Sequence, residues 1–438
     1  MVPNKFFLIL CIFVLPSLLC SRLMPSLAFA ALGACLLAKW VSKQPLAFEY
    51  SRRNLIGSNL LLTNMASNDI IAEVNWGIVG LGDVCQKKSG PSFDKCEGSK
   101  LAAVMRRTPR LAEYWARANV PDGKCNGYDN LDEFLMHSPL DAVYISTRPG
   151  THLEICRKVA AAGKAVYVEK PVGRCAAEAK EMAEICSRAN VPLYTAYISR
   201  AYERTEAIRH LLSKEFEGKV NSISYKLVGL GGARGMDAGL PWRLDAAQSG
   251  GGLIMDVGCH VVDRIDYLFG PLLNVQGHAE NKAKRQPVED YVHFTATVGP
   301  SDWATVSCEG ASVSCTWDFS GKQPREIDEF VIAGPKGSLK MAGMSPAGPI
   351  EVFDARGTLI KTVGDFTMPE HTAQALIQAV TNDLRGVVNS KTHCLSRIDN
   401  AIRTQSVLDE ALSSYYGGRE VGFWTRPESW PGKPKIIS

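Results

Sequence analysis

From residue 74 onward, short runs of apolar residues alternate with stretches in which apolar residues have helical spacing. The apolar runs that we interpret as buried strands are 74–79, 100–105, 142–146, 165–168 and 192–196. The stretches that we interpret as helices are 111–118, 131–136, 154–162 and 176–189. Continuous apolar strands alternating with helices are typical of a parallel sheet covered on both faces. We therefore expect a first α/β domain over residues 74–196, built on a doubly wound parallel sheet.

The second half of the chain has a different pattern. Its apolar runs are short, β-branched and often alternating, with Gly and Pro between them, which is typical of antiparallel strands. These runs are 220–229, 275–278, 291–298, 303–309, 329–332 and 350–354. Two later amphipathic stretches, 372–385 and 396–414, predict helices that pack on one domain or on the seam between the two. We expect residues 197–438 to form an α+β domain with a mostly antiparallel, open sheet.

Residues 1–42 form a separate hydrophobic segment. Its first apolar run, 6–19, resembles a secretory signal, and Ala28-Phe29-Ala30 fits a cleavage site. Its second run, 24–41, is near the minimum of about 17 residues that span a membrane. The segment can thus be a signal or a membrane anchor, and the sequence leaves the membrane as a partner undecided.

A third interpretation is that the working protein begins near Met65, just before the first expected strand. In that case we expect it to be cytoplasmic, and otherwise to enter the secretory pathway or be anchored in a membrane. Residues 43–73 keep no single period and predict a linker.

Charge and cysteine content exclude some classes of function. The 49 basic and 45 acidic residues leave a formal charge of +4, whereas nucleic-acid binders carry a strong basic excess. The 13 cysteines form no Cys-x-x-Cys pair, so neither a disulfide framework nor a metal site of the common zinc spacings is indicated. We expect no nucleic-acid partner and no metal.

A glycine-rich turn follows the first expected strand and precedes a helix. Its sequence from Gly80 reads Gly-Leu-Gly-Asp-Val-Cys. Gly80 permits the tight turn, and Gly82 lets backbone amides approach a pyrophosphate at the helix N-terminus. Cys85 replaces the usual third glycine and is still small enough for close packing. We expect Gly80, Gly82, Asp83, Val84 and Cys85 to bind a dinucleotide, although any tight turn can recruit glycines.

The second expected strand ends in Arg106-Arg107, and Arg106 lies 21 residues after Cys85. A site for NAD would carry an acidic residue near this position, to bind the ribose 2′-hydroxyl. Two guanidinium groups instead suit a 2′-phosphate. We therefore favour NADP over NAD as the cofactor. The alternative is that both arginines form a solvated strand end.

Glu169-Lys170-Pro171 places a lysine at the carboxyl end of a buried strand. Ligands bind at the carboxyl ends of strands in open α/β sheets. An unpaired buried charge is strongly unfavourable, so Lys170 needs either a partner or a chemical role.

Three consecutive glycines, 250–252, precede Asp256 and His260. On a helix these two residues share one face, and a carboxylate neighbour orients a histidine and stabilises its charged form. The alternative is a helix-capping aspartate and a core histidine. The glycine run and Lys170 favour a functional site.

Hydride transfer between a carbinol and nicotinamide needs a base for the hydroxyl proton and a group that stabilises charge on oxygen. His260 can be this base in oxidation and the acid in reduction. Lys170 can hydrogen-bond the same oxygen, and Asp256 can hold His260 or bind a substrate hydroxyl. Trp242-Arg243 offers an apolar plate and a fixed cation for a polyhydroxylated ring, unless it is a surface loop.

The motifs at 80–82, 169–171, 242–243, 250–252, 256–260 and 334–337 occur in an order that resembles the Gfo/Idh/MocA oxidoreductases. The resemblance covers residues 74 to about 414. It implies a Rossmann domain followed by an α/β domain whose open sheet often serves oligomerisation, and therefore a homodimer or homotetramer. It also implies pyridine-nucleotide redox chemistry on a small-molecule substrate, a sugar, cyclitol or related carbonyl compound.

By this resemblance Lys170, Asp256 and His260 take the catalytic positions. It likewise implies that the residues along the nicotinamide side are Thr147, Pro149, His152, Glu169 and Lys170. The chain departs from the family pattern at Cys85 and at Gly150-Thr151, where asparagine is frequent. The alternative hypothesis is a non-catalytic nucleotide-binding sensor or scaffold of the same fold, which the intact catalytic positions disfavour.

Overall fold

The computed structural model describes residues 71–432, with gaps at 121–122, 217–218, 230–241, 305, 307, 323–324, 368, 388–395, 420–422 and 426–428. The expected signal or anchor, 1–42, and nearly all of the expected linker lie outside the described residues. Within the described part, no helix is long and apolar enough to cross a membrane.

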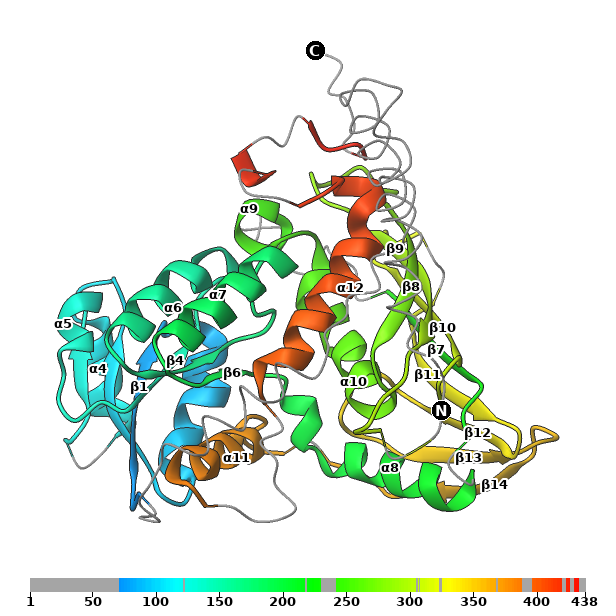
Figure 1. The fold of residues 1–438 in the computed structure, drawn as a ribbon, viewed down its shortest axis with the longest axis horizontal. Coiled ribbons are helices and arrows are strands. Elements are labelled where there is room, and N and C mark those ends of the chain that lie inside the picture. The colour runs from blue at the N-terminus through cyan, green and yellow to red at the C-terminus, as the bar shows by residue number, and fades with distance from the viewer. Residues whose placement is uncertain are drawn as a thin grey trace, which may run out of the picture. The chain divides into compact units, whose positions relative to one another are not determined.

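The first sheet has six strands, all parallel, in the order β3-β2-β1-β4-β5-β6 (Figure 1). Its strands are β1 (Val74–Val79), β2 (Ser99–Met105), β3 (Asn126–Tyr128), β4 (Ala142–Ile145), β5 (Ala165–Val168) and β6 (Leu193–Thr195). This order is that of a doubly wound dinucleotide-binding sheet. The prediction of the parallel sheet is confirmed, and only the three-residue β3 was missed.

Helices cover both faces of this sheet. The predicted helices are present as α4 (Leu111–Asn119), α5 (Leu131–Leu135), α6 (His152–Ala161) and α7 (Ala176–Arg188). On one face α5, α6 and α7 pack on Val79, Val143 and Val166. On the other face the core contains Trp76 and Tyr144 and is closed in part by α4.

A helix from the last fifth of the chain completes that second face. α11 (Gln374–Arg385) buries Leu376, Ile377 and Val380 against the first sheet. The Trp76 indole donates a hydrogen bond of 3.2 Å to the Thr381 hydroxyl. The other late helix, α12 (Ile398–Tyr416), packs on both α7 and the second sheet. The two late helices thus occupy the two places predicted for them, one on a domain and one on the seam.

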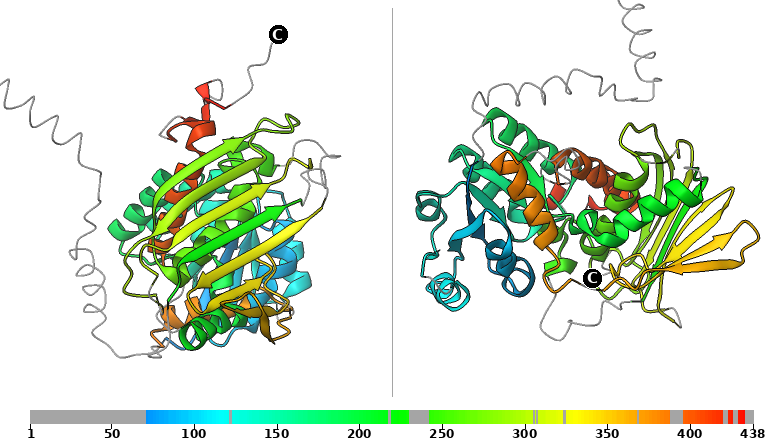
Figure 2. Two further views of the ribbon diagram at one scale, coloured as in Figure 1. Left: turned by 90° about the vertical axis from the view of Figure 1, so that its right-hand side faces the viewer. Right: turned by 90° about the horizontal axis from the view of Figure 1, so that it is seen from below.

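The second sheet has eight strands in the order β14-β13-β12-β11-β7-β10-β9-β8. They are β7 (Ser222–Val228), β8 (Leu272–Glu280), β9 (Tyr291–Val298), β10 (Ser312–Asp318), β11 (Ile327–Gly334), β12 (Gly337–Met341), β13 (Ile350–Asp354) and β14 (Leu359–Val363). Only β7 and β10 pair in parallel, so the predicted mostly antiparallel sheet is confirmed. Figure 2 shows one face without helices, whereas α8 (Glu203–Glu215), α10 (Cys259–Phe269) and α12 lie behind the other.

The predicted strand at 303–309 is wrong, because its described residues form turns. Their apolar side chains cover the C-terminal end of α10. The Trp303 indole donates to the Asp266 carbonyl at 3.2 Å, and the Cys308 thiol donates to the Phe269 carbonyl at 2.8 Å. The last carbonyls of a helix lack partners within the helix. Cys308 supplies a donor to that of Phe269, and Trp303 adds a second donor to that of Asp266, which already accepts from the Gly270 amide. The strand that follows is β10, which the sequence pattern missed along with β12 and β14.

The packing of β8 on α12 depends on a glycine. A Cβ atom at Gly277 would lie 2.4 Å from the Cα atom of Ala411. Backbone cannot move aside as a side chain can, so Gly277→Ala should force the helix from the strand. We expect this change to lower the free energy of unfolding by about 1–3 kcal/mol. Urea denaturation measures the loss. Gly418→Ala is the matched control, since a Cβ there meets nothing within 4 Å; equal losses in both variants would contradict the prediction.

Candidate active site

The first sheet reverses its strand order between β1 and β4, and the loops after these strands bound a crevice of the kind that binds ligands. β1 leads into Gly80, and β4 leads into Ser146 and Thr147. The neighbouring β5 leads into Glu169 and Lys170. The predicted cofactor and catalytic residues of the first half of the chain therefore meet at one edge of the sheet.

The glycine turn has the shape that a dinucleotide requires. Gly80 has φ +100°, and a Cβ there would lie 2.5 Å from the Ser146 carbonyl oxygen, so only glycine fits. A Cβ at Gly82 would meet nothing within 4 Å, which leaves open space beside the backbone. This fits the close approach of a pyrophosphate. Asp83 and Val84 are exposed, and Asp83 pairs with Lys87 at 2.6 Å.

Cys85 begins a π-helical turn, Cys85–Ser89, and is buried. Burial raises the pKa of its thiol to about 12, so the residue is a neutral packing group beside Ser89 and Ser146. The small side chain thus allows the close helix-on-strand packing expected of this position.

Arg106 leaves the end of β2 and turns back to the glycine turn, where its guanidinium donates to the Leu81 carbonyl. Among the described residues it forms no ion pair. Arg107 is exposed and has no hydrogen bond or ion pair in that same part of the chain. A cation therefore stands beside the turn where the ribose of a bound dinucleotide would lie.

The turn after β4 is braced from inside. His152 is fully buried, with Nδ1 3.1 Å from the Val172 carbonyl oxygen and Nε2 3.2 Å from that of Thr147. Burial lowers the pKa of His152, and a neutral imidazole donates to only one of these oxygens. His152 therefore supports the positions of the Thr147–Pro149 turn and of the loop after Lys170.

Glu169 anchors the same loop. The Tyr144 hydroxyl donates to one oxygen of the Glu169 carboxylate, and the Lys170 backbone amide donates to the other at 3.0 Å. Burial raises the pKa of Glu169. Glu169 therefore orients Lys170 through the backbone.

Lys170 and Asp256 join the two halves of the chain. The Lys170 ammonium donates to Asp256 Oδ1 at 2.8 Å and to the Asp256 backbone carbonyl at 2.9 Å. Arg243 Nε donates to the remaining carboxylate oxygen at 2.7 Å. Burial opposes both charges, yet Asp256 raises the pKa of Lys170, while Lys170 and Arg243 hold the pKa of Asp256 well below its usual range.

The prediction that Asp256 holds His260 is not realised, since no hydrogen bond joins them and both Asp256 oxygens are occupied. Asp256 lies in a π-helical turn, Ile254–Gly258, and His260 in the first turn of α10. A π turn bonds i to i+5, so the i, i+4 geometry used for the prediction does not apply. The second predicted role of Asp256, toward a substrate hydroxyl, stays a prediction.

His260 is half-buried and packs edge-on against Tyr197, with ring centroids 6.3 Å apart. Burial and the nearby charge of Lys170 hold the pKa of His260 well below its ordinary value. This shift favours the neutral imidazole, which is the form that can accept a proton.

Trp242 is flanked by two cations, the guanidinium carbon of Arg243 at 4.5 Å from the ring centroid and that of Arg148 at 5.9 Å. The turn after β4 and the segment that follows Trp242 approach each other closely at Gly150. A Cβ atom at Gly150 would lie 2.8 Å from the Ala247 carbonyl oxygen. The departure from the family pattern at Gly150 thus accompanies this close approach.

Sequence reasoning missed Arg148, Tyr197 and Glu289. Glu289 lies under the glycine run, where it accepts a 2.8 Å hydrogen bond from the Gly252 amide and another from the Tyr416 hydroxyl. A Cβ at Gly252 would lie 2.3 Å from the Glu289 carbonyl oxygen. No spacing rule links residues so far apart, and only the triple glycine signalled that another group comes close.

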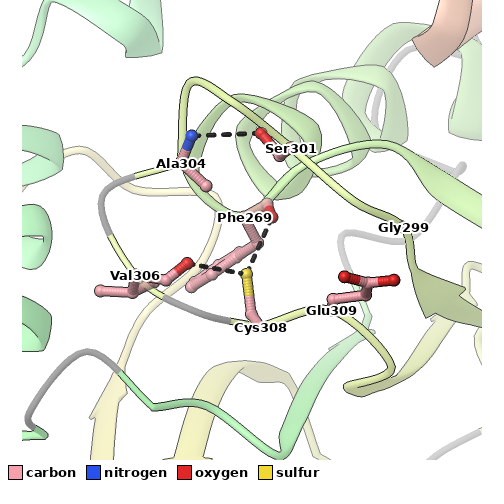
Figure 3. Close-up of a pocket in the computed structure, with 7 residues that line it drawn as sticks. All are labelled: Phe269, Gly299, Ser301, Ala304, Val306, Cys308 and Glu309. Carbon is pink, nitrogen blue, oxygen red and sulfur yellow. Dashed lines mark hydrogen bonds between the residues drawn. The ribbon is translucent and has the colours of Figure 1, made fainter. Parts of the chain in front are cut away.

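A cavity of about 290 Å³ lies at the other end of α10 from His260 (Figure 3). It is lined by Phe269, Gly299, Ser301, Ala304, Val306, Cys308 and Glu309. None of these is among the predicted site residues, so this cavity is separate from the Lys170–Asp256 site.

A doubly wound sheet with an open glycine turn, beside a lysine, an aspartate and a neutral histidine, defines a dinucleotide-binding oxidoreductase. Residues 74–197 match the family described as "Oxidoreductase family, NAD-binding Rossmann fold". Residues 205–340 match the "GFO/IDH/MocA C-terminal domain". The chain belongs to the Gfo/Idh/MocA oxidoreductase family.

Named relatives and solved structures agree with this assignment. "Oxidoreductase P35" of Formosa agariphila is 29% identical over 310 residues, 70% of this chain and 89% of that protein. "Trans-1,2-dihydrobenzene-1,2-diol dehydrogenase" of Mus musculus is 29% identical over 200 residues, 45% of this chain and 56% of the relative, so just over half of its length is matched. The crystal structure of aldose-aldose oxidoreductase from Caulobacter crescentus has a TM-score of 0.63 at 22% identity, covering 78% of this chain and 98% of that one.

The pKa of Glu289 predicts a pH effect on stability. Burial raises this pKa from 4.5 to about 7. The folded state thus binds the proton more tightly than the unfolded state, and its stability falls as pH rises from about 4.5 to about 7. Glu289→Gln removes the buried charge, so its melting temperature relative to the parent should rise across this window. Glu309→Gln, at an exposed position, is the control and should follow the parent. A difference between Glu289→Gln and the parent that is constant with pH would contradict the prediction.

Proposed function

We propose that this protein is an NADP-preferring dehydrogenase or reductase. It transfers hydride between nicotinamide and a carbinol or carbonyl carbon of a sugar, cyclitol or related cyclic diol. The observation that carries the proposal is the 2.8 Å contact between Lys170 Nζ and Asp256 Oδ1. This contact places the lysine of the cofactor-binding sheet beside the segment that carries His260. The dihydrodiol dehydrogenase and aldose oxidoreductase named above support the substrate class.

When bound, the nicotinamide accepts or supplies the hydride. In oxidation the neutral imidazole of His260 takes the proton of the substrate hydroxyl. Lys170 has three N–H groups, and Asp256 accepts from two of them within the described residues. The third is available to the substrate oxygen, where a fixed positive charge stabilises the alkoxide that forms.

Asp256 and Arg243 act on this site in different ways. Asp256 fixes Lys170 and keeps it charged, because it accepts two hydrogen bonds from that ammonium. Arg243 shares the carboxylate and also lies over the Trp242 ring. The apolar indole beside fixed donors suits a polyhydroxylated ring, which presents both C–H and hydroxyl faces.

The roles of Lys170 and His260 can be separated from cofactor binding. We expect Lys170→Ala and His260→Ala each to lower turnover by about 10²–10⁴-fold, the usual contribution of acid–base groups. Cofactor affinity should change little in His260→Ala. The measurement is NADPH formation against a panel of sugars, inositols, aldoses and dihydrodiols, with fluorescence titration of NADPH. His210→Ala, on the exposed face of α8, is the control.

If either variant kept full turnover on an identified substrate, the role given to that residue would be wrong. Saturable cofactor binding without turnover on any member of the panel would instead favour the non-catalytic sensor.

The preference for NADP has a test of its own. Arg106 stands beside the glycine turn and forms no ion pair among the described residues, so its charge is available to a 2′-phosphate. Arg106→Ala should raise the dissociation constant of NADPH about tenfold or more and leave that of NADH nearly unchanged. Arg117→Ala, at an exposed pair with Glu113, is the control. Equal affinities for the two cofactors in the parent protein would overturn the preference.

A further inference from the structure

Arg264 is a buried cation whose guanidinium lacks a hydrogen-bonded carboxylate within the described part of the chain. It lies on α10, four residues and one turn beyond His260, and is 6% exposed. Its Nε is buried without a hydrogen bond, and its guanidinium makes no hydrogen bond or ion pair with any residue of the structure's described part. An isolated buried cation is strongly unfavourable. A cation kept in such a place calls for a negative partner, and no residue in the described ranges hydrogen-bonds to it as one.

The carboxylates around Arg264 are engaged elsewhere. Asp263 accepts from the buried guanidinium of Arg200, and Asp266 accepts from Arg403 at 2.8 Å. Asp328 accepts backbone amide hydrogen bonds of 2.8–3.0 Å from the Gly343–Met344 turn. Burial lowers the pKa of Arg264, and the charges of Asp328 and Asp263 oppose this shift from a distance. Neither carboxylate accepts a hydrogen bond from Arg264 in the described part of the chain.

A second arginine nearby is not available for a ligand. Arg204, on α8, directs its two terminal nitrogens at the backbone carbonyls of Ala342, Ser345 and Ala347. It therefore secures the loop after β12. Of these two neighbouring arginines only Arg264 has no hydrogen bond to a described residue, and a single fork of two N–H groups matches the two oxygens of a carboxylate.

The position of Arg264 relates it to the candidate active site. His260 and Arg264 lie four residues apart on α10, and Asp256 lies in the π-helical turn that precedes them. The charge of Arg264, like that of Lys170, lowers the pKa of His260. The site also has two cations, Lys170 and Arg243, on the single carboxylate of Asp256. Glu169 is a second carboxylate beside Lys170, so the three cations Lys170, Arg243 and Arg264 face two carboxylates in this described group.

We propose that Arg264 binds a carboxylate on the substrate, so that the physiological substrate is an acidic sugar, a uronic or aldonic acid, rather than a neutral one. This inference rests on the proposed function and narrows its substrate class. The guanidinium holds the carboxylate at one end of the sugar while His260 and Lys170 act on a hydroxyl further along.

The test compares acidic sugars with their neutral counterparts on the full chain. The probes are D-galacturonate and D-gluconate against D-galactose and D-glucose, with D-glucose 6-phosphate as a second anion. Binding to the NADPH-saturated protein is followed by quenching of NADPH fluorescence, and turnover with NADP⁺ is followed by absorbance. We expect at least one acid to bind about tenfold or more tightly than its neutral counterpart.

Variants distinguish recognition from a structural role. Arg264→Met should weaken binding of the acid about 10- to 100-fold and leave the neutral sugar within about twofold. Arg264→Lys keeps the positive charge but loses the paired N–H donors. Its affinity for the acid should therefore lie between that of the parent and that of Arg264→Met. Arg209→Met is the control, because it loses a guanidinium that contacts the Tyr267 hydroxyl at 3.1 Å. It should change neither the affinity for the acid nor that for the neutral sugar.

Equal affinity for acids and neutral sugars, or equal losses for both in Arg264→Met, would overturn the proposal. Tighter binding of the sugar phosphate than of either acid would also overturn it. Binding of the acid that depends on Arg264 but leads to no turnover would instead refute the proposed dehydrogenase and leave this inference standing. Turnover of neutral sugars without binding of the acids would refute this inference and leave the proposed dehydrogenase standing.

Discussion

The ion pair between Lys170 and Asp256 is the interaction on which the candidate site depends. It is the direct link between the loop at the end of β5 and the segment that leads into α10. Both side chains are largely buried, at 17% and 23% exposure, so each charge needs the other. Removal of Asp256 would leave the buried Lys170 ammonium without its ion-pair partner, which typically costs about 3–5 kcal/mol, whereas removal of Lys170 would leave Asp256 paired with Arg243. The site is therefore held by the same contact that equips it for chemistry.

The neighbouring charges set the states of the other groups. Arg243 shares Asp256 and keeps that carboxylate ionised, although burial opposes its charge. His260 is pushed in the opposite direction, toward the neutral imidazole, by burial and by the cation beside it. A fixed ammonium next to a neutral base is the combination that proton removal from an alcohol requires.

The sequence could predict the elements whose signal is local. Continuous apolar runs identified the parallel strands. The glycine turn was recognisable because the chain at Gly80 leaves no room for a Cβ atom, so that only glycine fits there. The pairing of Lys170 with Asp256 was not predictable from spacing, since 86 positions separate the two residues. The expected contact of Asp256 with His260 failed because the π-helical turn changes the register that the spacing argument assumed. The run 303–309 was taken for a strand because residues that cap α10 are as apolar as strand residues.

Other features depend on groups that meet only in the folded chain. Glu289 contacts the glycine run across 37 positions, and nothing in its local sequence marks it. Arg264 does continue the spacing of Asp256 and His260, but only the structure shows that the surrounding carboxylates are occupied. Side-chain roles set by competition between partners thus cannot be derived from spacing.

The contact of α11 with the first sheet bears on how the protein is made. Trp76 and Thr381 are separated by 305 positions, and α11 closes the core above β1. During synthesis the six parallel strands leave the ribosome long before this helix does. Until then Trp76 and its apolar neighbours have no cover from α11, and exposed apolar surface on an incomplete chain favours aggregation. The nucleotide-binding half is thus finished late, and the growing chain has to be protected while it waits for its own C-terminal part.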